Sequence, residues 1–290
     1  MTVDYTESLG QRQLHGYIES IYSGKMITDT TDVIPPHEIN IYLPDLKVGF
    51  EFNDVEWHSE LLGKDRRYHL VKHDLCFDQD IRLIQIWENE WWNKQDIVKS
   101  RIQSLLQHGN RIFARKCTIQ ELTSKQSKAF FDSAHIQGGA SAQVHLGLVH
   151  NDEVVAAMNF CKSRYDKNGG IELLRYANKI NTNVIGGASK ILNYYIKNHH
   201  PTKITSYADK RWSDGNLYKQ LGFTYSGSSN ANYFYFKGNS RLMSRIQFQK
   251  HKLVEKLARF DPELTEWQNM VIDGYNRIWD CGSSKWVLEL

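Results

Sequence analysis

The chain has 290 residues, a formal net charge of +3 and 41% hydrophobic residues. This length and apolar content are enough for two domains with buried cores, which excludes an extended disordered chain. No apolar run approaches the roughly 18 residues that a membrane-spanning helix needs, and the first residues, Met1–Tyr5, lack a basic region followed by an apolar one. We therefore expect a soluble, cytoplasmic protein. The four cysteines lack zinc or disulfide spacing, which predicts free buried thiols.

The first third of the sequence has the pattern of an α/β domain over residues 1–110. Apolar spacing predicts, in chain order, a helix at 11–23, a loop up to Pro36, strands at about 38–43 and 47–52, a helix at 64–79, a buried strand at 81–87 and a helix at 91–106.

A second α/β unit is predicted over residues 117–237, followed by a tail over 238–290. The expected strands lie near 144–150, 153–161, 171–178, 203–208 and 232–236, with helices near 124–134, 187–198 and 213–221. In the tail, a basic helix around 241–256 precedes a short hairpin around Cys281-Gly282.

Polar residues at the end of the first domain's strands suggest phosphodiester chemistry. Glu51 lies inside an apolar strand, where a carboxylate is costly unless it is paired or bound to a metal, and Mg²⁺ favours one or two carboxylates. His58 could serve as general base or acid because its unperturbed pKa is near neutrality, although a structural histidine fits the spacing as well. Asp65 fits either a second catalytic acid or an acid placed in the first turn of a helix.

Several ordered motifs between residues 10 and 106 resemble the very-short-patch-repair (Vsr-like) endonucleases, and look closest to their phage relatives, the EDxHD homing endonucleases. The motifs are Glu38–Pro44, Gly49–Asp54, Trp57–Glu60, Lys64–Leu70 and Asp80–Trp91. The resemblance implies a PD-(D/E)XK-type core, with Mg²⁺ or Mn²⁺ held by Asn40 and Glu51. It implies catalytic positions at Asn40, Glu51, His58, Asp65, Asn53 and Gln11.

Two of these positions depart from the family pattern. Asn40 stands where the metal-binding Asp is expected and Gln11 where a helical Glu is expected, so each acid is replaced by its amide. Asn40 is compatible with a substitution made to trap a complex or with natural loss of the site. A zinc site at His69 and His73, near Cys76, is an alternative, because histidines four residues apart share one helix face.

The glycine segment Asn183–Ser189 precedes an apolar helix, so its backbone N–H groups could hold a pyrophosphate, or it could be a glycine loop packed on a strand. Together with Glu153–Phe160, Ile204–Asp209 and Asn216–Phe223, it resembles the GNAT acetyltransferase fold over about 120–237, and more loosely the phage Mom-like DNA-modification branch of that fold. The acyl-CoA loop of the family is matched at Gly186, Gly187 and Ala188. Asn183 replaces the usual Gln or Arg, so we expect no acetyl-CoA binding.

The resemblance implies a site-specific, metal-dependent homing endonuclease that hydrolyses double-stranded DNA in the cytoplasm, of the host cell if a phage encodes it. We expect duplex DNA and no membrane as the partner, and a homodimer is compatible with the sequence. DNA contacts are expected at Lys210, Arg211, Arg241, Arg245, Lys250 and Lys252. The alternative is a GNAT-type acyltransferase, or a DNA-base-modifying protein, that carries a degenerate nuclease module.

Overall fold

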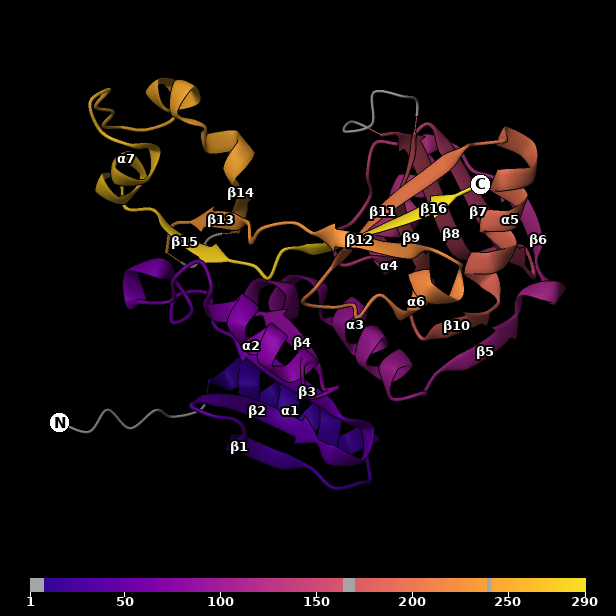
Figure 1. Ribbon diagram of the computed structural model, residues 1–290, viewed down its shortest axis with the longest axis horizontal. Helices are drawn as coiled ribbons and strands as arrows, with labels where there is room; N and C mark the ends of the chain where they lie inside the picture. The colour runs from indigo at the N-terminus through magenta and orange to yellow at the C-terminus, as the bar shows by residue number, and fades with distance from the viewer. Residues whose placement is uncertain (1–7, 164–169, 239–240) are drawn as a thin grey trace. The chain divides into compact units, whose positions relative to one another are not determined.

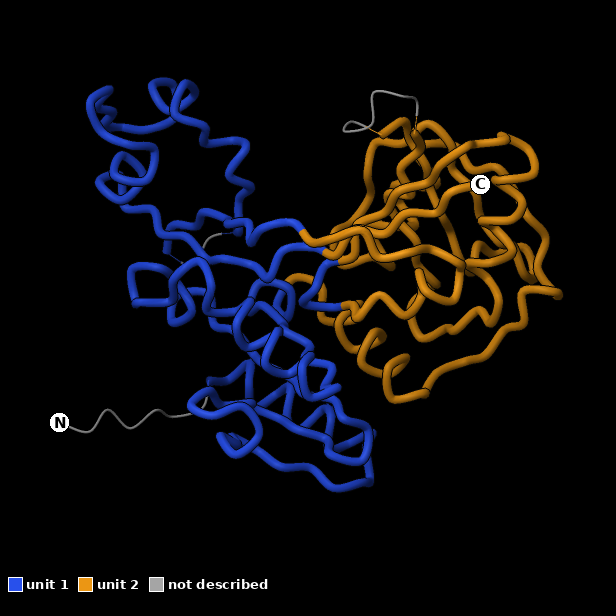
Figure 2. Tube along the Cα trace, viewed as in Figure 1, with its two compact units in different colours: residues 1–92, 209–212, 229–283 blue, residues 93–208, 213–228, 284–290 orange. Residues whose placement is uncertain are grey.

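The computed structural model describes residues 8–163, 170–238 and 241–290. The chain divides into two compact units (Figure 2): unit 1 comprises 1–92, 209–212 and 229–283, and unit 2 comprises 93–208, 213–228 and 284–290. The segment Met1–Tyr5, which lacks a basic region followed by an apolar one, lies outside the described residues. Among the residues that are described, no helix is long and apolar enough to cross a membrane.

Unit 1 contains a four-stranded sheet in the order β1-β2-β3-β4 (Figure 1). The first three strands pair antiparallel, and β3 pairs parallel with β4. Every residue of β3 is buried, as expected for an apolar central strand. The elements are α1 (Leu9–Ile21), β1 (Ile27–Ile34), β2 (His37–Leu43), η1 (Pro44–Leu46), β3 (Val48–Asn53), η2 (Glu60–Leu62), α2 (Tyr68–Phe77), β4 (Arg82–Trp87) and α3 (Glu88–Leu105), which continues into unit 2.

Two predictions for this sheet are corrected. The predicted loop before Pro36 contains the strand β1, whose polar residues are largely exposed because it lies at the sheet edge. The predicted helix at 64–79 begins only at Tyr68, where α2 starts.

The rest of unit 1 is a three-stranded sheet in the order β14-β13-β15 with one short helix. Its elements are β13 (Tyr233–Phe236), β14 (Met243–Ser244), η4 (Arg245–Phe248), η5 (Lys250–Glu255), α7 (Glu266–Ile272) and β15 (Asn276–Trp279). The predicted basic α-helix around 241–256 is wrong, because η4 and η5 are 3₁₀ segments. Phe248 and Leu253 both enter the core beside Tyr235, and their spacing of five does not place two side chains on one face of an α-helix.

Unit 2 is built on a seven-stranded sheet in the order β12-β16-β11-β9-β8-β7-β6. A separate parallel pair joins β5 to β10. The elements are β5 (Asn110–Phe113), η3 (Ala114–Lys116), β6 (Thr118–Glu121), α4 (Ser124–Ala134), β7 (Val144–His150), β8 (Glu153–Lys162), β9 (Ile171–Asn178), β10 (Thr182–Ile185), α5 (Gly187–His199), β11 (Lys203–Asp209), α6 (Asn216–Gln220), β12 (Thr224–Ser228) and β16 (Ser283–Glu289).

Helices cover both faces of this sheet. Successive residues of β8 point to opposite faces, and Met158 and Phe160 pack with Ile191 of α5, whereas Ala157 packs with Phe131 of α4. The alternation of side chains along β8 therefore places α4 and α5 on opposite sides of the sheet.

The predicted domain ranges 1–110, 117–237 and 238–290 do not coincide with the two observed units. The course of the final strand, β16, shows one difference. β15 pairs with β13 in unit 1, while β16 lies between β12 and β11 in the sheet of unit 2. Cys281-Gly282 therefore joins strands of two different sheets, and the predicted hairpin at this point is wrong.

Candidate functional site

The parallel strands β9 and β11 of unit 2 pair over only three residues each. Ile171–Leu173 faces Ile204–Ser206, and no further pairing between these strands occurs in the part of the chain that the structure describes. On its other edge, β9 has a bulge at Leu174, because Leu173 pairs with Phe160 and Arg175 with Asn159. From the bulge onwards, the edge of β9 that faces β11 has no partner strand among the described residues. An unpaired strand edge is where an extended ligand can bind through main-chain hydrogen bonds.

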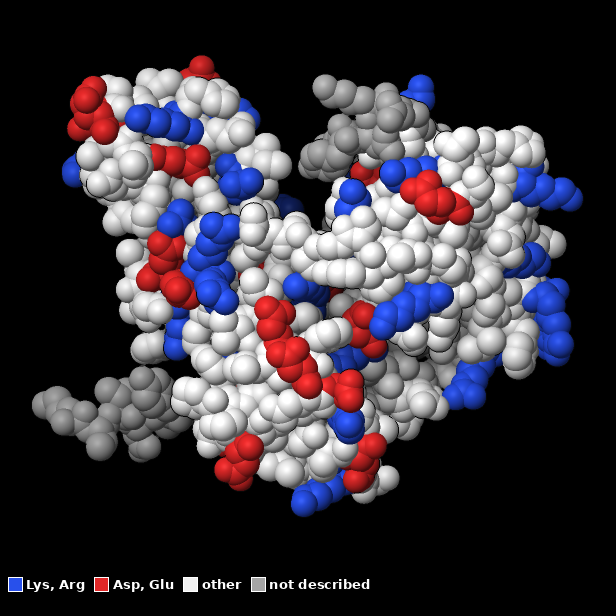
Figure 3. Space-filling view, in the orientation of Figure 1, with Lys and Arg blue, Asp and Glu red and all other residues white. Residues whose placement is uncertain are grey.

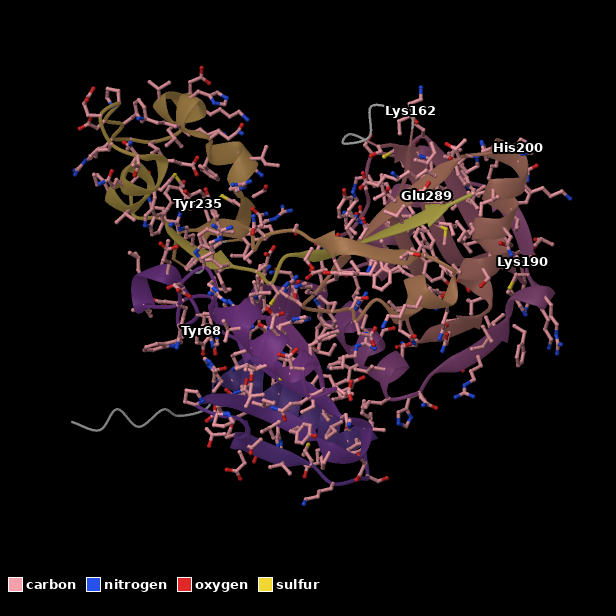
Figure 4. The ribbon with its side chains drawn as sticks, viewed as in Figure 1. Tyr68, Lys162, Lys190, His200, Tyr235 and Glu289 are labelled. Carbon is pink, nitrogen blue, oxygen red and sulfur yellow. The ribbon has the colours of Figure 1, made fainter. Side chains whose placement is uncertain are left out.

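The helix α5 begins close to these strands, after the turn at Gly186. Gly186 has φ of +75°, a left-handed conformation that favours glycine, and α5 has neither a side-chain cap nor an acidic residue in its first turn. Its first N–H groups and its dipole therefore favour an anion. Lys190 on α5 (Figure 4) donates to the carbonyl oxygens of Ala114 and Cys117, so its ammonium group ties η3 to the helix.

One amide of this helix terminus has a partner from β9. The N–H of Ala188 donates to the hydroxyl of Tyr176, which in turn donates to Asn178 Oδ1 at 2.8 Å. A Cβ built on Gly187 would lie 2.9 Å from the same hydroxyl. Gly187 is therefore required for close packing of α5 on β9. For this one glycine, the structure agrees with the alternative of a glycine loop packed on a strand.

Tyr218 of α6 lies where β9 and β11 diverge. Ser206 Oγ donates to the carbonyl oxygen of Leu173 at 2.8 Å and lies 2.9 Å from the Tyr218 hydroxyl oxygen. Burial raises the pKa of Tyr218, and the contrary effects of Ser206 and Arg175 do not cancel that rise. Tyr218 therefore keeps its proton near neutral pH. The sequence analysis quoted the segment Asn216–Phe223 for its fold alone and missed this residue, although a tyrosine within a recognised motif was a visible signal.

In unit 1, the structure brings Glu51 and Asn40 together but engages both with the chain itself. Lys72 Nζ lies 2.6 Å from Glu51 Oε2, and the N–H of Asn40 donates to Glu51 Oε1 at 3.3 Å. Asn40 Oδ1 accepts the N–H of Phe52 at 2.9 Å. Lys72 thus offsets part of the cost of burying the Glu51 carboxylate, although burial still raises the pKa of Glu51 above its ordinary value.

The other predicted catalytic residues have separate environments. His58 Nδ1 lies 3.2 Å from His69 Nε2, and Asn53 Nδ2 donates weakly to Gln85 at 3.5 Å. Asp65 accepts the N–H of Arg67, and Gln11 donates to Asp29, both at exposed positions.

The structure tests the zinc alternative at His69, His73 and Cys76. Among the described residues there is no group of three or more His, Cys, Asp or Glu side chains that could hold a metal ion. His73 pairs with Asp74 while its helix neighbour His69 contacts His58, so the zinc alternative is wrong.

The residues predicted to contact DNA differ from one another in burial and in the groups that they contact. Arg211 is 4% exposed and binds Glu90 and Asp209, each at 2.9 Å, so it stabilises the core of unit 1. Lys210 lies 3.8 Å from Asp74, and the ammonium groups of Lys250 and Lys252 donate to the carbonyl oxygens of Pro262 and Ile246. Arg245 lies over the Tyr233 ring, and Arg241 is exposed. Figure 3 shows acidic and basic side chains interspersed on the displayed face of this C-terminal part of unit 1.

The fold has parallels among solved structures, although no protein-family model and no curated protein matches the chain. It is similar to an IAA acetyltransferase from Bacillus cereus (13% identity, TM-score 0.34) and to a Bacillus subtilis acetyltransferase in complex with CoA (13%, 0.35). It is also similar to Arabidopsis thaliana Naa50 in complex with the bisubstrate analogue CoA-Ac-MVNAL (10%, 0.37). Each match covers 60% of this chain and 99% of the other.

These findings correct the functional prediction. The chain has a mixed α/β fold, and the matches to acetyltransferase structures cover 60% of it. The solved structures that it resembles are acetyltransferases, and Glu51 is occupied by Lys72. The predicted Vsr-like PD-(D/E)XK homing endonuclease, a Mg²⁺- or Mn²⁺-dependent hydrolase, is corrected by these findings. The sequence also led us to expect no acetyl-CoA, whereas two of these solved structures contain CoA or a CoA analogue.

Proposed function

We propose that unit 2 transfers an acyl group from a CoA thioester to an acceptor amine, as in the alternative function drawn from the sequence. The observation that supports this most is the three-residue pairing of β9 with β11, which ends beside the partly buried hydroxyl of Tyr218. An extended thioester arm along the free edge of β9 would bring its carbonyl carbon to this point.

The terminus of α5 suits the diphosphate of CoA in most respects. The helix has 13 residues, its first turn contains no acid, and a Cβ built on Gly186 would make only an ordinary van der Waals contact, with Ala114 at 3.8 Å. The Tyr176 hydroxyl already occupies the amide of Ala188, so the remaining first-turn N–H groups would bind the phosphates.

Tyr218 would supply a proton at the end of the reaction. The acceptor nitrogen attacks the thioester carbonyl carbon, the carbon–sulfur bond breaks, and the departing thiolate takes the phenolic proton of Tyr218. The proton that the acceptor nitrogen loses on becoming an amide nitrogen passes to solvent, and the Tyr218 phenolate regains a proton from solvent for the next cycle. Ser206 Oγ lies 2.9 Å from the phenolic oxygen, so its single proton can turn from the Leu173 carbonyl to the phenolate and stabilise it. The high pKa of Tyr218 keeps this proton available before the reaction starts.

Calorimetric titration with acetyl-CoA tests this proposal. We expect saturable binding to the wild-type chain, weakened at least tenfold by Ser189→Asp, because a carboxylate in the first turn of α5 repels phosphate while favouring the helix dipole. Ser189→Asn, which is similar in size and neutral, is the matched control. Absence of saturable binding by the wild-type chain would overturn the proposal.

A further inference from the structure

Asn159 is an unusual residue for the middle of an apolar strand. Its side chain in β8 is 0% exposed, and neither Oδ1 nor Nδ2 has a hydrogen-bond partner among the described residues. An asparagine side chain can make up to four hydrogen bonds, and leaving them unmade in a protein interior is costly. A polar group from outside the chain would remove this cost.

Arg175 lies directly opposite Asn159 in the adjacent strand β9. Cross-strand partners share one face of a sheet, and this is the face covered by α4, because Ala157 and Ala177, two positions along each strand, pack with Phe131. Arg175 Nε is buried without a partner, and Nη1 donates to the carbonyl oxygen of Leu174 at 2.7 Å. In the described part of the chain, no carboxylate forms an ion pair with this guanidinium.

The electrostatic surroundings of Arg175 favour an anion. Burial lowers the pKa of Arg175 itself, and the opposing effects of Tyr218 and of the Glu172 charge do not cancel this. Burial also lowers the pKa of nearby His135 well below the ordinary value, an effect to which the charges of Arg175, Arg101 and Lys94 add. His135 is therefore neutral, and the fixed charges that act on it are positive. Arg175 follows Leu173 by two residues in β9, and the Leu173 carbonyl accepts the Ser206 hydroxyl that lies 2.9 Å from Tyr218. The charge of Arg175 accordingly acts to lower the pKa of Tyr218.

We propose that Arg175 and Asn159 form the acceptor subsite and that the acceptor is an amino acid, with its carboxylate next to the amine that is acylated. This inference rests on the proposed function. The planar guanidinium of Arg175 can hold a carboxylate by two hydrogen bonds, and Asn159 Nδ2 can donate another. Asn159 Oδ1 then accepts from the acceptor N–H, a donor that a phosphate group does not supply.

Matched acceptors provide the test. The purified full chain is assayed with acetyl-CoA against the free amino acids and against the same amino acids as carboxamides, which keep the amine and lose the charge. We expect kcat/KM for at least one free amino acid to exceed that of its carboxamide by about 10- to 100-fold. Arg175→Gln should remove most of that preference through KM, with the Kd of acetyl-CoA unchanged.

Two further variants complete the test. Asn159→Leu, which removes the polar atoms at similar size, should raise KM for the free amino acid and raise the melting temperature. Lys125→Gln removes an exposed positive charge on α4. It should change neither the KM for the free amino acid nor the melting temperature.

The outcomes separate this inference from the proposed function. If acetyl-CoA binds but free amino acids and carboxamides react equally well or not at all, the acceptor subsite is wrong and the CoA site stands. The same conclusion follows if Arg175→Gln keeps the preference. If Arg175→Gln fails to fold, two other measurements test the subsite. These are the preference of the wild-type chain for a free amino acid over its carboxamide and the KM of Asn159→Leu for the free amino acid. An absent preference or an unchanged KM would overturn the inference. If acetyl-CoA does not bind, the proposed function fails, and the inference fails with it.

Discussion

Glu51 and Lys72 of unit 1 form an ion pair at 2.6 Å between side chains that are only 2% and 5% exposed. Burial opposes the charge of Lys72, but Glu51 outweighs this effect and raises the pKa of the ammonium group. The pair explains how a carboxylate can lie in the fully buried strand β3 without a metal. It also makes the two residues interdependent.

Removing one partner of this pair should be more harmful than removing both. Lys72→Met leaves an uncompensated buried carboxylate and should reduce the free energy of unfolding by about 3–5 kcal/mol, whereas Glu51→Leu with Lys72→Met should cost much less. Urea unfolding measures both. Lys47→Met is the control, because the pair of Lys47 with Asp80 is exposed and should be worth at most about 1 kcal/mol. Equal losses in the single and double variants would contradict the interpretation.

The stacked pair of His58 and His69 should make stability depend on pH. Burial lowers the pKa of both rings, that of His69 to about 3. The unfolded chain takes up these protons below about pH 6.5, so stability should fall as pH falls from 6.5 towards 3, by up to about 1.4 kcal/mol per pH unit and per group.

His69→Gln should therefore flatten the dependence of the unfolding free energy on pH between 7.5 and 5. Burial and Glu88 raise the pKa of Asp54 to about 6, so Asp54 makes stability rise as pH falls, opposite to the histidines. Comparing the variant with the wild-type chain cancels this contribution, because both contain Asp54. His251→Gln, at an exposed position, serves as control. Parallel profiles for His69→Gln and the wild-type chain would contradict the prediction.

Tyr218→Phe should lower the kcat of acyl transfer by roughly 100-fold, in the range expected for loss of a general acid. The Kd of acetyl-CoA should not change, since the hydroxyl acts on the departing thiolate. Tyr225→Phe is the matched control, because its hydroxyl contacts only Ser228 at the surface. A kcat equal to that of the wild-type chain would remove Tyr218 from the mechanism.

Gly215 and Gly222 form a matched pair that tests whether β16 belongs to unit 2. Both have φ above +75°, but a Cβ on Gly215 would lie 2.0 Å from the Trp286 ring of β16, whereas that on Gly222 would meet only Leu288, at 3.8 Å. Gly222→Ala should cost about 1–2 kcal/mol for the left-handed conformation alone. Gly215→Ala should cost clearly more, and equal losses in thermal unfolding would contradict the packing of Trp286 on this turn.

Binding of duplex DNA stays a prediction of the sequence and has a direct test. Arg241, Arg245 and Lys250 are exposed, and replacing all three with Ala should reduce the slope of log affinity against log salt by about 0.9 for each phosphate that the variant no longer neutralises. Arg211→Ala should instead lower the melting temperature, since Arg211 is buried between Glu90 and Asp209. An unchanged slope in fluorescence anisotropy would exclude these three residues as phosphate ligands.

The sequence by itself determined most of the regular elements. The strands β7, β8 and β9 and the helices α4 and α5 were predicted within one residue at either end, because the periodicity of apolar residues is a local property. The edge strand β1 was missed because its exposed polar residues give no such period.

Only the tertiary structure decided which residues meet. Glu51 looked like a metal ligand until folding placed Lys72, 21 positions away, against it, and Arg211 looked free to bind phosphate until Glu90, 121 positions away, was found beside it. Asn159 and Arg175, whose buried polar atoms include several without a hydrogen-bond partner, come to lie side by side only when β8 and β9 are in register. The charge state and partners of a side chain depend on contacts between distant segments, and local periodicity does not encode these contacts.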